Sequence, residues 1–129
     1  MSQQPASASE PAGFNPHLLT TTIDLPTLHT DLVEDLVQID GSPVIDYTHF
    51  SLALSRSRKF ARWVGWNIDG THLQLLSRTG ITFTTDPRIP AEVQVGNDLY
   101  KDNRLDRGHL ARRADLTWGP DTEAHQANA

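Results

Sequence analysis

The sequence predicts an α+β domain: an antiparallel sheet, a long loop and a minor helical part. Three observations support this prediction. Strand patterns occupy residues 47–54 and 60–68, and the dipeptide Asp69-Gly70 between two such patterns is typical of a hairpin turn. Residues 77–100 show no period and contain Gly80, Pro87, Pro90 and Gly96, which indicates a long structured loop. Residues 120–127 have the acidic first turn of a helix start.

The expected sheet is a three-stranded meander. Residues 47–54 alternate large apolar side chains with small or polar ones, which is the period of a half-buried strand. Residues 60–68 are rich in aromatic side chains and almost continuously apolar, as in a central strand covered on both faces. Residues 71–76 resume the strand pattern after the turn. The loop that follows is expected to be anchored by Ile81 and Phe83, and residues 104–110 are expected to be extended.

The N-terminal third predicts little regular structure. Residues 1–13 are rich in Ser, Ala, Gln and Pro and predict a disordered tail, which leaves residues 14–129 as the folded domain. Pro16 and Pro26 favour an extended arm over residues 14–28. Two interpretations stay open for residues 31–37: a short acidic helix with Thr30 as its N-cap, or an irregular ledge that ends at a turn over residues 40–43.

Composition narrows the class of protein. No cysteine is present, so neither a disulfide nor a thiolate metal site can form. We expect no secretion signal, because the first eleven residues lack a basic start and an apolar core, and localisation stays open between the cytoplasm and a non-classical export route. No apolar run approaches membrane-spanning length.

Charge is unevenly distributed along the chain. The net charge is −5, yet all 11 basic residues lie in residues 56–129, and residues 1–55 hold only acidic ones. Between Lys101 and Arg113 the sequence has five basic and two acidic residues. Because attraction to phosphate acts over about 8 Å at physiological salt, a local basic surface matters more than the total. An ordinary solvated charged face would look the same.

The basic segment contains the tetrapeptide Asp106-Arg107-Gly108-His109. Arginine presents a planar fork that matches phosphate oxygens, and histidine accepts a proton near neutral pH. This pairing of residue types suits hydrolysis of a phosphodiester.

The tetrapeptide resembles the signature of the DNA/RNA non-specific endonuclease family of the ββα-metal superfamily. Residues 60–68 resemble the family's aromatic strand, residues 86–90 its loop before the signature, and residues 115–119 the segment after it. The order and spacing of these matches agree, and the resemblance extends from Tyr47 to the C-terminus. It implies an incomplete ββα-metal nuclease fold in which the long loop is an active-site loop.

The resemblance implies an endonuclease that hydrolyses DNA and RNA phosphodiesters without sequence specificity. His109 would be its general base, and Arg78, upstream of the loop at Asp86, would stabilise charge on the phosphate. For His109 the alternative is a structural histidine bonded to a backbone carbonyl. For Arg78 it is a surface arginine at the end of a strand.

Four further residues complete the expected site. Arg107 either contacts a phosphate or pairs with Asp102 or Asp106 to brace the loop. Asp106 is expected to fix the loop or to bind a water on the metal, without being a metal ligand itself. Arg112 and Arg113 are expected to face solvent or the nucleic-acid backbone.

The resemblance also implies a single divalent ion, Mg²⁺ or Mn²⁺. Its asparagine ligand is expected on a helix beyond Ala129, because Asn128 lies too close to the signature. No metal ligand is therefore assigned in this chain, and the sequence predicts the N-terminal part of a nuclease domain, truncated at its C-terminus. The alternative is a catalytically deficient fragment that only binds nucleic acid or a protein. A homodimer and an inhibitor protein stay open as partners beside DNA and RNA.

Overall fold

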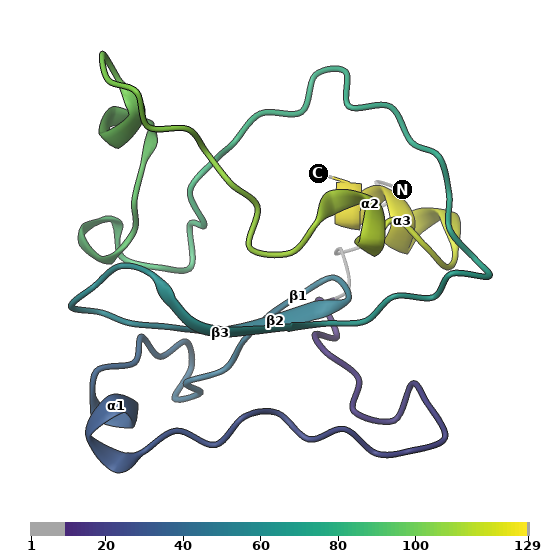
Figure 1. Ribbon diagram of the computed structural model, residues 1–129, viewed down its shortest axis with the longest axis horizontal. Coiled ribbons are helices and arrows are strands. Elements are labelled where there is room, and N and C mark those ends of the chain that lie inside the picture. The colour runs from purple at the N-terminus through teal and green to yellow at the C-terminus, as the bar shows by residue number, and fades with distance from the viewer. Residues whose placement is uncertain (1–9, 129) are drawn as a thin grey trace, which may run out of the picture.

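The computed structural model describes residues 10–128, so most of the predicted tail, residues 1–9, lies outside the described residues. A three-stranded antiparallel sheet forms the middle layer, in the order β1 (Ile45–Tyr47), β2 (Phe50–Leu54), β3 (Ala61–Trp66). The N-terminal segment with α1 (Thr30–Glu34) runs along one side of the sheet (Figure 1). The long loop, α2 (Arg113–Leu116) and α3 (Asp121–Asn128) lie on the other side. The α+β prediction is confirmed.

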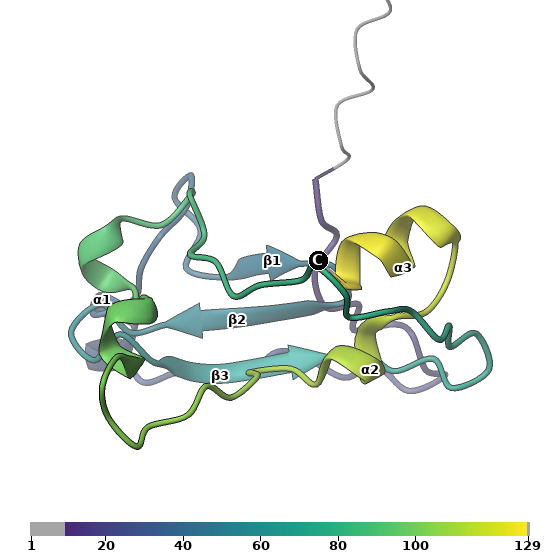
Figure 2. The ribbon, with the colours of Figure 1, turned by 90° about the horizontal axis from the view of Figure 1, so that it is seen from above.

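The two helices and the long loop cover different ends of the sheet. Seen from above, α2 and α3 lie together at one end (Figure 2). Two 3₁₀ segments of the long loop, η1 (Ala91–Val93) and η2 (Asn97–Tyr100), lie toward the opposite end. The C-terminal helix predicted from Pro120 is confirmed, with Asp121 and Glu123 in its first turn. The segment 104–110 that connects the two ends forms neither helix nor strand and has bends at both of its ends.

The prediction of one strand over residues 47–54 is wrong, because a hairpin turn interrupts it. β1 and β2 pair with Tyr47 opposite Phe50, which leaves Thr48 and His49 as a two-residue turn. His49 has a φ of 68°, a left-handed conformation that histidine adopts more readily than most residues. The sequence gives no signal for this turn, because Thr48 and His49 are neither the glycine nor the asparagine that usually occupies a two-residue hairpin turn.

The second predicted strand is present, but its place in the sheet differs from the prediction. β3 is an edge strand with mostly half-buried residues, whereas β2 is central and all but its first residue are buried. The expected arm lies against the sheet, but it is not extended throughout, because residues 16–21 turn and the backbone N–H of Ile23 donates to the Pro16 carbonyl at 2.9 Å. Phe14 and Leu25 lie over Gly65, and the backbone N–H of Gly13 donates to the Tyr47 carbonyl at 3.0 Å.

The predicted third strand over residues 71–76 is wrong. Instead of closing a hairpin, the Asp69 carboxylate accepts hydrogen bonds from the backbone N–H and the hydroxyl of Thr71, at 3.1 and 2.7 Å. The chain then leaves the sheet. Leu73 forms an isolated bridge with Trp118, and the N–H of Gln74 donates to the Thr117 carbonyl at 2.7 Å. The meander therefore has three strands, but β1 replaces the predicted last one.

Residues 30–42 settle the interpretation left open for this segment. The helix is formed as α1, with His29 at the N-cap and Thr30 as its first residue, so it begins one position earlier than predicted. The predicted turn is confirmed by reciprocal backbone hydrogen bonds of 3.0 Å between Ile39 and Ser42. Asp40 and Gly41 inside it both have positive φ, the conformation of a tight hairpin turn.

The core lies between β1, β2 and the long loop. It consists of six buried aliphatic side chains: Val37, Ile45, Leu52, Leu54, Ile89 and Val93. Ile89 and Val93 anchor the long loop, with exposed fractions of 6% and 4%. The predicted anchors Ile81 and Phe83 are instead 37% and 44% exposed. The second half of the loop is thus fixed to the sheet, while its first half presents apolar side chains to solvent.

Candidate active site

The long loop is attached to the sheet by a polar cluster around Asp86. The hydroxyl of Tyr47 donates to one carboxylate oxygen at 2.7 Å, and Arg88 donates to the same oxygen at 2.8 Å through Nη2. The Arg88 guanidinium also lies over the Tyr47 ring, 5.0 Å from its centroid. Burial raises the pKa of Asp86, but these hydrogen bonds outweigh it and hold the pKa below its usual value. The cluster therefore keeps an ionised carboxylate at the base of the loop.

A second cluster attaches the C-terminal part to the β1–β2 turn. The imidazole of His49 stacks on the Trp118 indole at 3.5 Å between ring centroids, and its Nε2 lies 3.1 Å from the Trp118 carbonyl oxygen. The indole N–H donates to the carbonyl of Asn67 at 3.0 Å. Trp118 thereby joins the end of α2 to both β hairpins, and this fixes where the chain enters α3.

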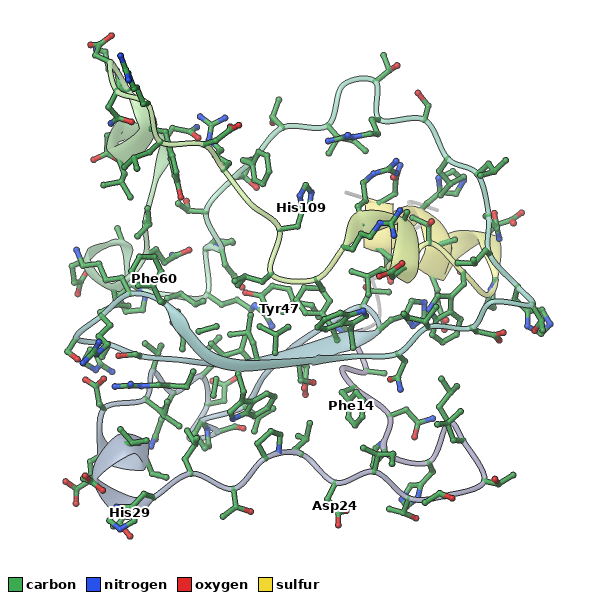
Figure 3. The ribbon with its side chains drawn as sticks, in the orientation of Figure 1. Phe14, Asp24, His29, Tyr47, Phe60 and His109 are labelled. Atoms are coloured by element: carbon green, nitrogen blue, oxygen red, sulfur yellow. The ribbon has the colours of Figure 1, made fainter. Side chains whose placement is uncertain are left out.

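His109 lies on the segment that runs between these two attachments. Its side chain is exposed and points away from the sheet (Figure 3). The ring is tilted against the Phe83 ring, with 5.2 Å between centroids and 57° between planes. Within residues 10–128, no hydrogen bond occupies either ring nitrogen of His109. The alternative of a structural histidine bonded to a carbonyl describes His49, which has this contact, and not His109.

Arg78 and His109 line the same open cavity, although 31 positions separate them. The cavity measures about 400 Å³, and apolar side chains from β1, β2, the long loop and the residues after His109 form much of its wall. Arg78 is exposed at its rim. The tertiary structure thus brings together the two residues that the sequence proposed as base and charge stabiliser.

Arg107 does not follow the alternative in which it pairs with an aspartate to brace the loop. Its guanidinium lies 5.5 Å from the centroid of the Phe83 ring and 5.5 Å from that of Tyr100. In the described part of the chain it forms no ion pair with Asp102 or Asp106. The Asp106 carboxylate instead accepts a hydrogen bond from the backbone N–H of Arg107 at 3.0 Å, which fits the predicted loop-fixing role of Asp106.

The neighbouring arginines have different environments. Arg112 faces solvent as predicted, with 78% of its side chain exposed and Asp115 only at 4.0 Å. The prediction for Arg113 is corrected, because its side chain is half-buried. Its Nη1 donates to the side-chain oxygen of Asn128 and approaches the Leu76 carbonyl at 3.5 Å. Arg113 therefore joins α2, α3 and the start of the long loop.

Comparison with known proteins identifies the family. The family model for the DNA/RNA non-specific endonucleases matches residues 29–129. The chain belongs to the DNA/RNA non-specific endonuclease family. Its relatives include the Sinorhizobium fredii protein y4fB, 38% identical over 90% of this chain, and a Nostoc protein named "Nuclease", 33% identical over 53% of it. The chain spans 19% and 25% of the lengths of these relatives. No solved structure matches.

Sequence reasoning within this family missed three interactions of the site. It treated Tyr47 as part of a strand, Tyr100 as the end of a loop and Asn128 only as a rejected metal ligand. The structure places these residues against Asp86, Arg107 and Arg113 respectively. The contact of Tyr47 had a signal in the sequence, because the Asp86-Pro87-Arg88 loop carries the carboxylate to which the Tyr47 hydroxyl donates. Nothing local indicated the other two.

The residues around His109 do not by themselves fit the divalent ion that the family resemblance implies. Such ions prefer several carboxylate or carbonyl oxygens. The described lining of the cavity contains no carboxylate, and its one side-chain amide oxygen, on Asn128, already accepts a hydrogen bond from Arg113. Over residues 10–128 no cluster of three His, Asp or Glu side chains could hold a metal.

None of the helices in this range combines the length and apolarity that crossing a membrane requires.

Proposed function

We propose that this chain carries the catalytic base of a sequence-non-specific endonuclease that hydrolyses DNA and RNA phosphodiesters. The observation that carries the proposal is the shared cavity of His109 and Arg78 within a chain of this family. The cavity is open to solvent, so a sugar-phosphate backbone could reach both side chains. The ββα-metal arrangement belongs to the same proposal, because the described elements include the sheet, the signature segment and α3.

His109 takes a proton from the attacking water. Its exposed ring has a nitrogen without a hydrogen-bond partner among residues 10–128, and histidine is the side chain that most often acts as a general base. The water oxygen forms the new bond to phosphorus, the bond from phosphorus to one ester oxygen breaks, and that oxygen leaves with a proton from solvent. The Phe83 ring limits the orientations that the imidazole can adopt.

Arg78 stabilises the negative charge that accumulates on the phosphate during this step. Its guanidinium is permanently charged and has donors in a fixed fork, which matches two oxygens of one phosphate. No partner carboxylate lines the cavity among the described residues, so its charge is not neutralised there. Arg112, exposed on the adjoining segment, would add affinity for the backbone that does not depend on sequence.

Dependence on a divalent ion is part of the proposal because the family resemblance implies one. Mg²⁺ is the first choice and Mn²⁺ the second. A bound ion would polarise the phosphate and stabilise the leaving oxygen. The described residues supply no ligand set for it, so the roles assigned to this chain are those of the imidazole and the guanidinium.

A second candidate function follows from that missing ligand set. The chain would bind nucleic acid or a protein partner without cutting it. Its exposed arginines support salt-sensitive binding of a phosphate backbone, which needs no metal. The two candidates differ in turnover and not in binding.

A plasmid assay tests the proposal. Supercoiled plasmid is incubated with the chain in Mg²⁺, in Mn²⁺ and in EDTA, and nicking is followed on agarose. We expect nicking that EDTA abolishes and that His109→Ala lowers by about a hundredfold or more, because a general base contributes at least that much. The matched control is His125→Ala, which removes an exposed histidine on α3 outside the cavity.

Three outcomes separate the candidates. Equal nicking by the wild type and His109→Ala would remove His109 from the mechanism. Binding that weakens with salt, with no nicking in either metal, would favour the non-cutting candidate. Loss of nicking in His125→Ala as well would point to a general effect of the substitutions and not to a base.

A further inference from the structure

A second, smaller pocket adjoins the cavity of His109. It measures about 170 Å³ and is lined by the first half of the long loop, by η2 and by the signature segment. Phe83, Thr84 and Gly108 line both spaces, so the pocket lies directly beside the cavity. The pocket is smaller than the roughly 300–1,000 Å³ of sites for drug-sized ligands, so it suits a single ring system.

The walls of this pocket are aromatic and cationic. Phe83 and Tyr100 contribute their rings, and the Arg107 guanidinium lies 5.5 Å from both ring centroids. Such contacts leave the N–H edge of the guanidinium available to an acceptor. Thr84, Thr85 and Asn97 add polar side chains around the rings. Phe83 is 44% exposed, so the apolar surface here is open to a ligand.

We propose that this pocket binds one unpaired nucleobase of the nucleic acid whose phosphate lies at His109. The inference rests on the proposed nuclease function and adds a subsite to it. The base stacks on the Tyr100 ring, and the N–H edge of Arg107 donates to its carbonyl or ring-nitrogen acceptors. Stacking of this kind accepts any base, because every base has a π face. The pocket therefore adds affinity without sequence specificity.

Charge alone would not make this pocket a nucleic-acid site. Residues 97–108 contain three basic side chains, Lys101, Arg104 and Arg107. The same residues contain three acidic ones, Asp98, Asp102 and Asp106. Because these charges cancel, attraction to the phosphate backbone is weak on this side of the cavity, and stacking is the larger contribution available.

The geometry also predicts which strands are preferred. A base inside a duplex is stacked on both faces and paired along one edge, so it has to leave the helix before it can enter a separate pocket. A single-stranded substrate avoids that cost. We therefore expect tighter binding of single strands than of duplexes of the same length, and a loss of this preference when the stacking surface is removed.

Fluorescence anisotropy of a labelled ten-nucleotide DNA strand tests the inference. Binding is measured in EDTA, so that no cleavage occurs, and is compared with that of an abasic strand with the same phosphate backbone. We expect the wild type to bind the base-bearing strand about tenfold more tightly. Tyr100→Leu keeps the apolar bulk but removes the π face, so it should abolish most of the difference. Tyr100→Phe should retain it.

Equal affinity of the wild type for the two strands would overturn the inference, because the phosphates would then account for all of the binding. Tyr100→Leu with an undiminished preference for bases would also overturn it. If Tyr100→Leu fails to fold, as judged by its urea midpoint, the comparison of the two strands with the wild type still decides.

The failure of this inference differs from the failure of the proposed function. A chain that nicks plasmid through His109 and binds both strands equally is a nuclease without a base pocket. A chain that prefers the base-bearing strand but never nicks plasmid has the pocket without the activity.

Discussion

The hydroxyl of Tyr47, at the end of β1, donates a hydrogen bond of 2.7 Å to the Asp86 carboxylate in the long loop, 39 positions away. Burial and the neighbouring carboxylate raise the pKa of Tyr47 well above its ordinary range, so the hydroxyl stays protonated and remains a donor. The bond joins the sheet to the loop that carries one wall of the candidate active site.

Tyr47→Phe should lower the free energy of unfolding by about 1–2 kcal/mol, because it removes a hydrogen bond to a charged group that is largely buried. Urea denaturation measures the change. The control is Tyr100→Phe, whose hydroxyl has no hydrogen-bond partner in residues 10–128 and whose removal should change stability by less than about 0.5 kcal/mol. Equal effects of the two substitutions would show that the bond to Asp86 does not hold the loop.

Arg113→Ala should change the stability of the fold, whereas Arg112→Ala should change the binding of nucleic acid. Arg113→Ala should lower the free energy of unfolding by about 1–3 kcal/mol, because it leaves the buried oxygen of Asn128 without its donor. Arg112→Ala should leave stability almost unchanged. It should instead reduce the slope of binding affinity against salt by about one, if Arg112 contacts a phosphate. Urea denaturation and a salt titration of DNA binding measure these effects, and an unchanged stability of Arg113→Ala would contradict the structure.

His49 should make stability fall in mildly acidic solution. Burial lowers the pKa of its imidazole, and the Trp118 carbonyl and Glu123 only partly offset this. The unfolded chain therefore takes up a proton, at a pKa of about 6.5, more readily than the folded chain does. The contribution of His49 to the free energy of unfolding is therefore complete above that pH and is lost as the pH falls below it.

Urea midpoints measured from pH 7.5 to pH 5 test this. His49→Asn is the appropriate comparison, because asparagine tolerates the left-handed backbone at this position and does not titrate. The stability difference between the wild type and His49→Asn should shrink as the pH falls. A difference that stays constant over this range would mean that His49 titrates equally in the two states.

Arg78→Ala should lower the rate of plasmid nicking by about a hundredfold, as expected when one donor to a developing negative charge is removed. Arg78→Lys should recover part of the rate, because the charge returns without the planar fork. Arg58→Ala removes an equal charge from an exposed arginine in the β2–β3 connection and serves as the control. A rate in Arg78→Ala equal to that in Arg58→Ala would assign only general electrostatics to Arg78.

The sequence predicted local features of the fold better than pairings between distant segments. The turn at Asp40-Gly41 and the helix from Pro120 were correct, because each depends on residues close together in the chain. The hairpin predicted from Asp69-Gly70 was wrong. The Asp69 side chain closes a local turn with Thr71, and Leu73 pairs with Trp118. A dipeptide typical of hairpins indicates that the residues can form a turn. It does not indicate which segment the residues after the turn will pair with.

By itself, the sequence determined the family, through the signature at residues 106–109 and its ordered neighbours, together with the concentration of arginines after residue 55. It also proposed His109 and Arg78, from residue chemistry and resemblance. Only the tertiary structure decided that these two side chains share a cavity, that Arg107 lies against two aromatic rings, and that Arg113 holds Asn128. The physical reason is that charge and residue type are local properties. The partner of an arginine depends on which distant segment the core packing brings beside it.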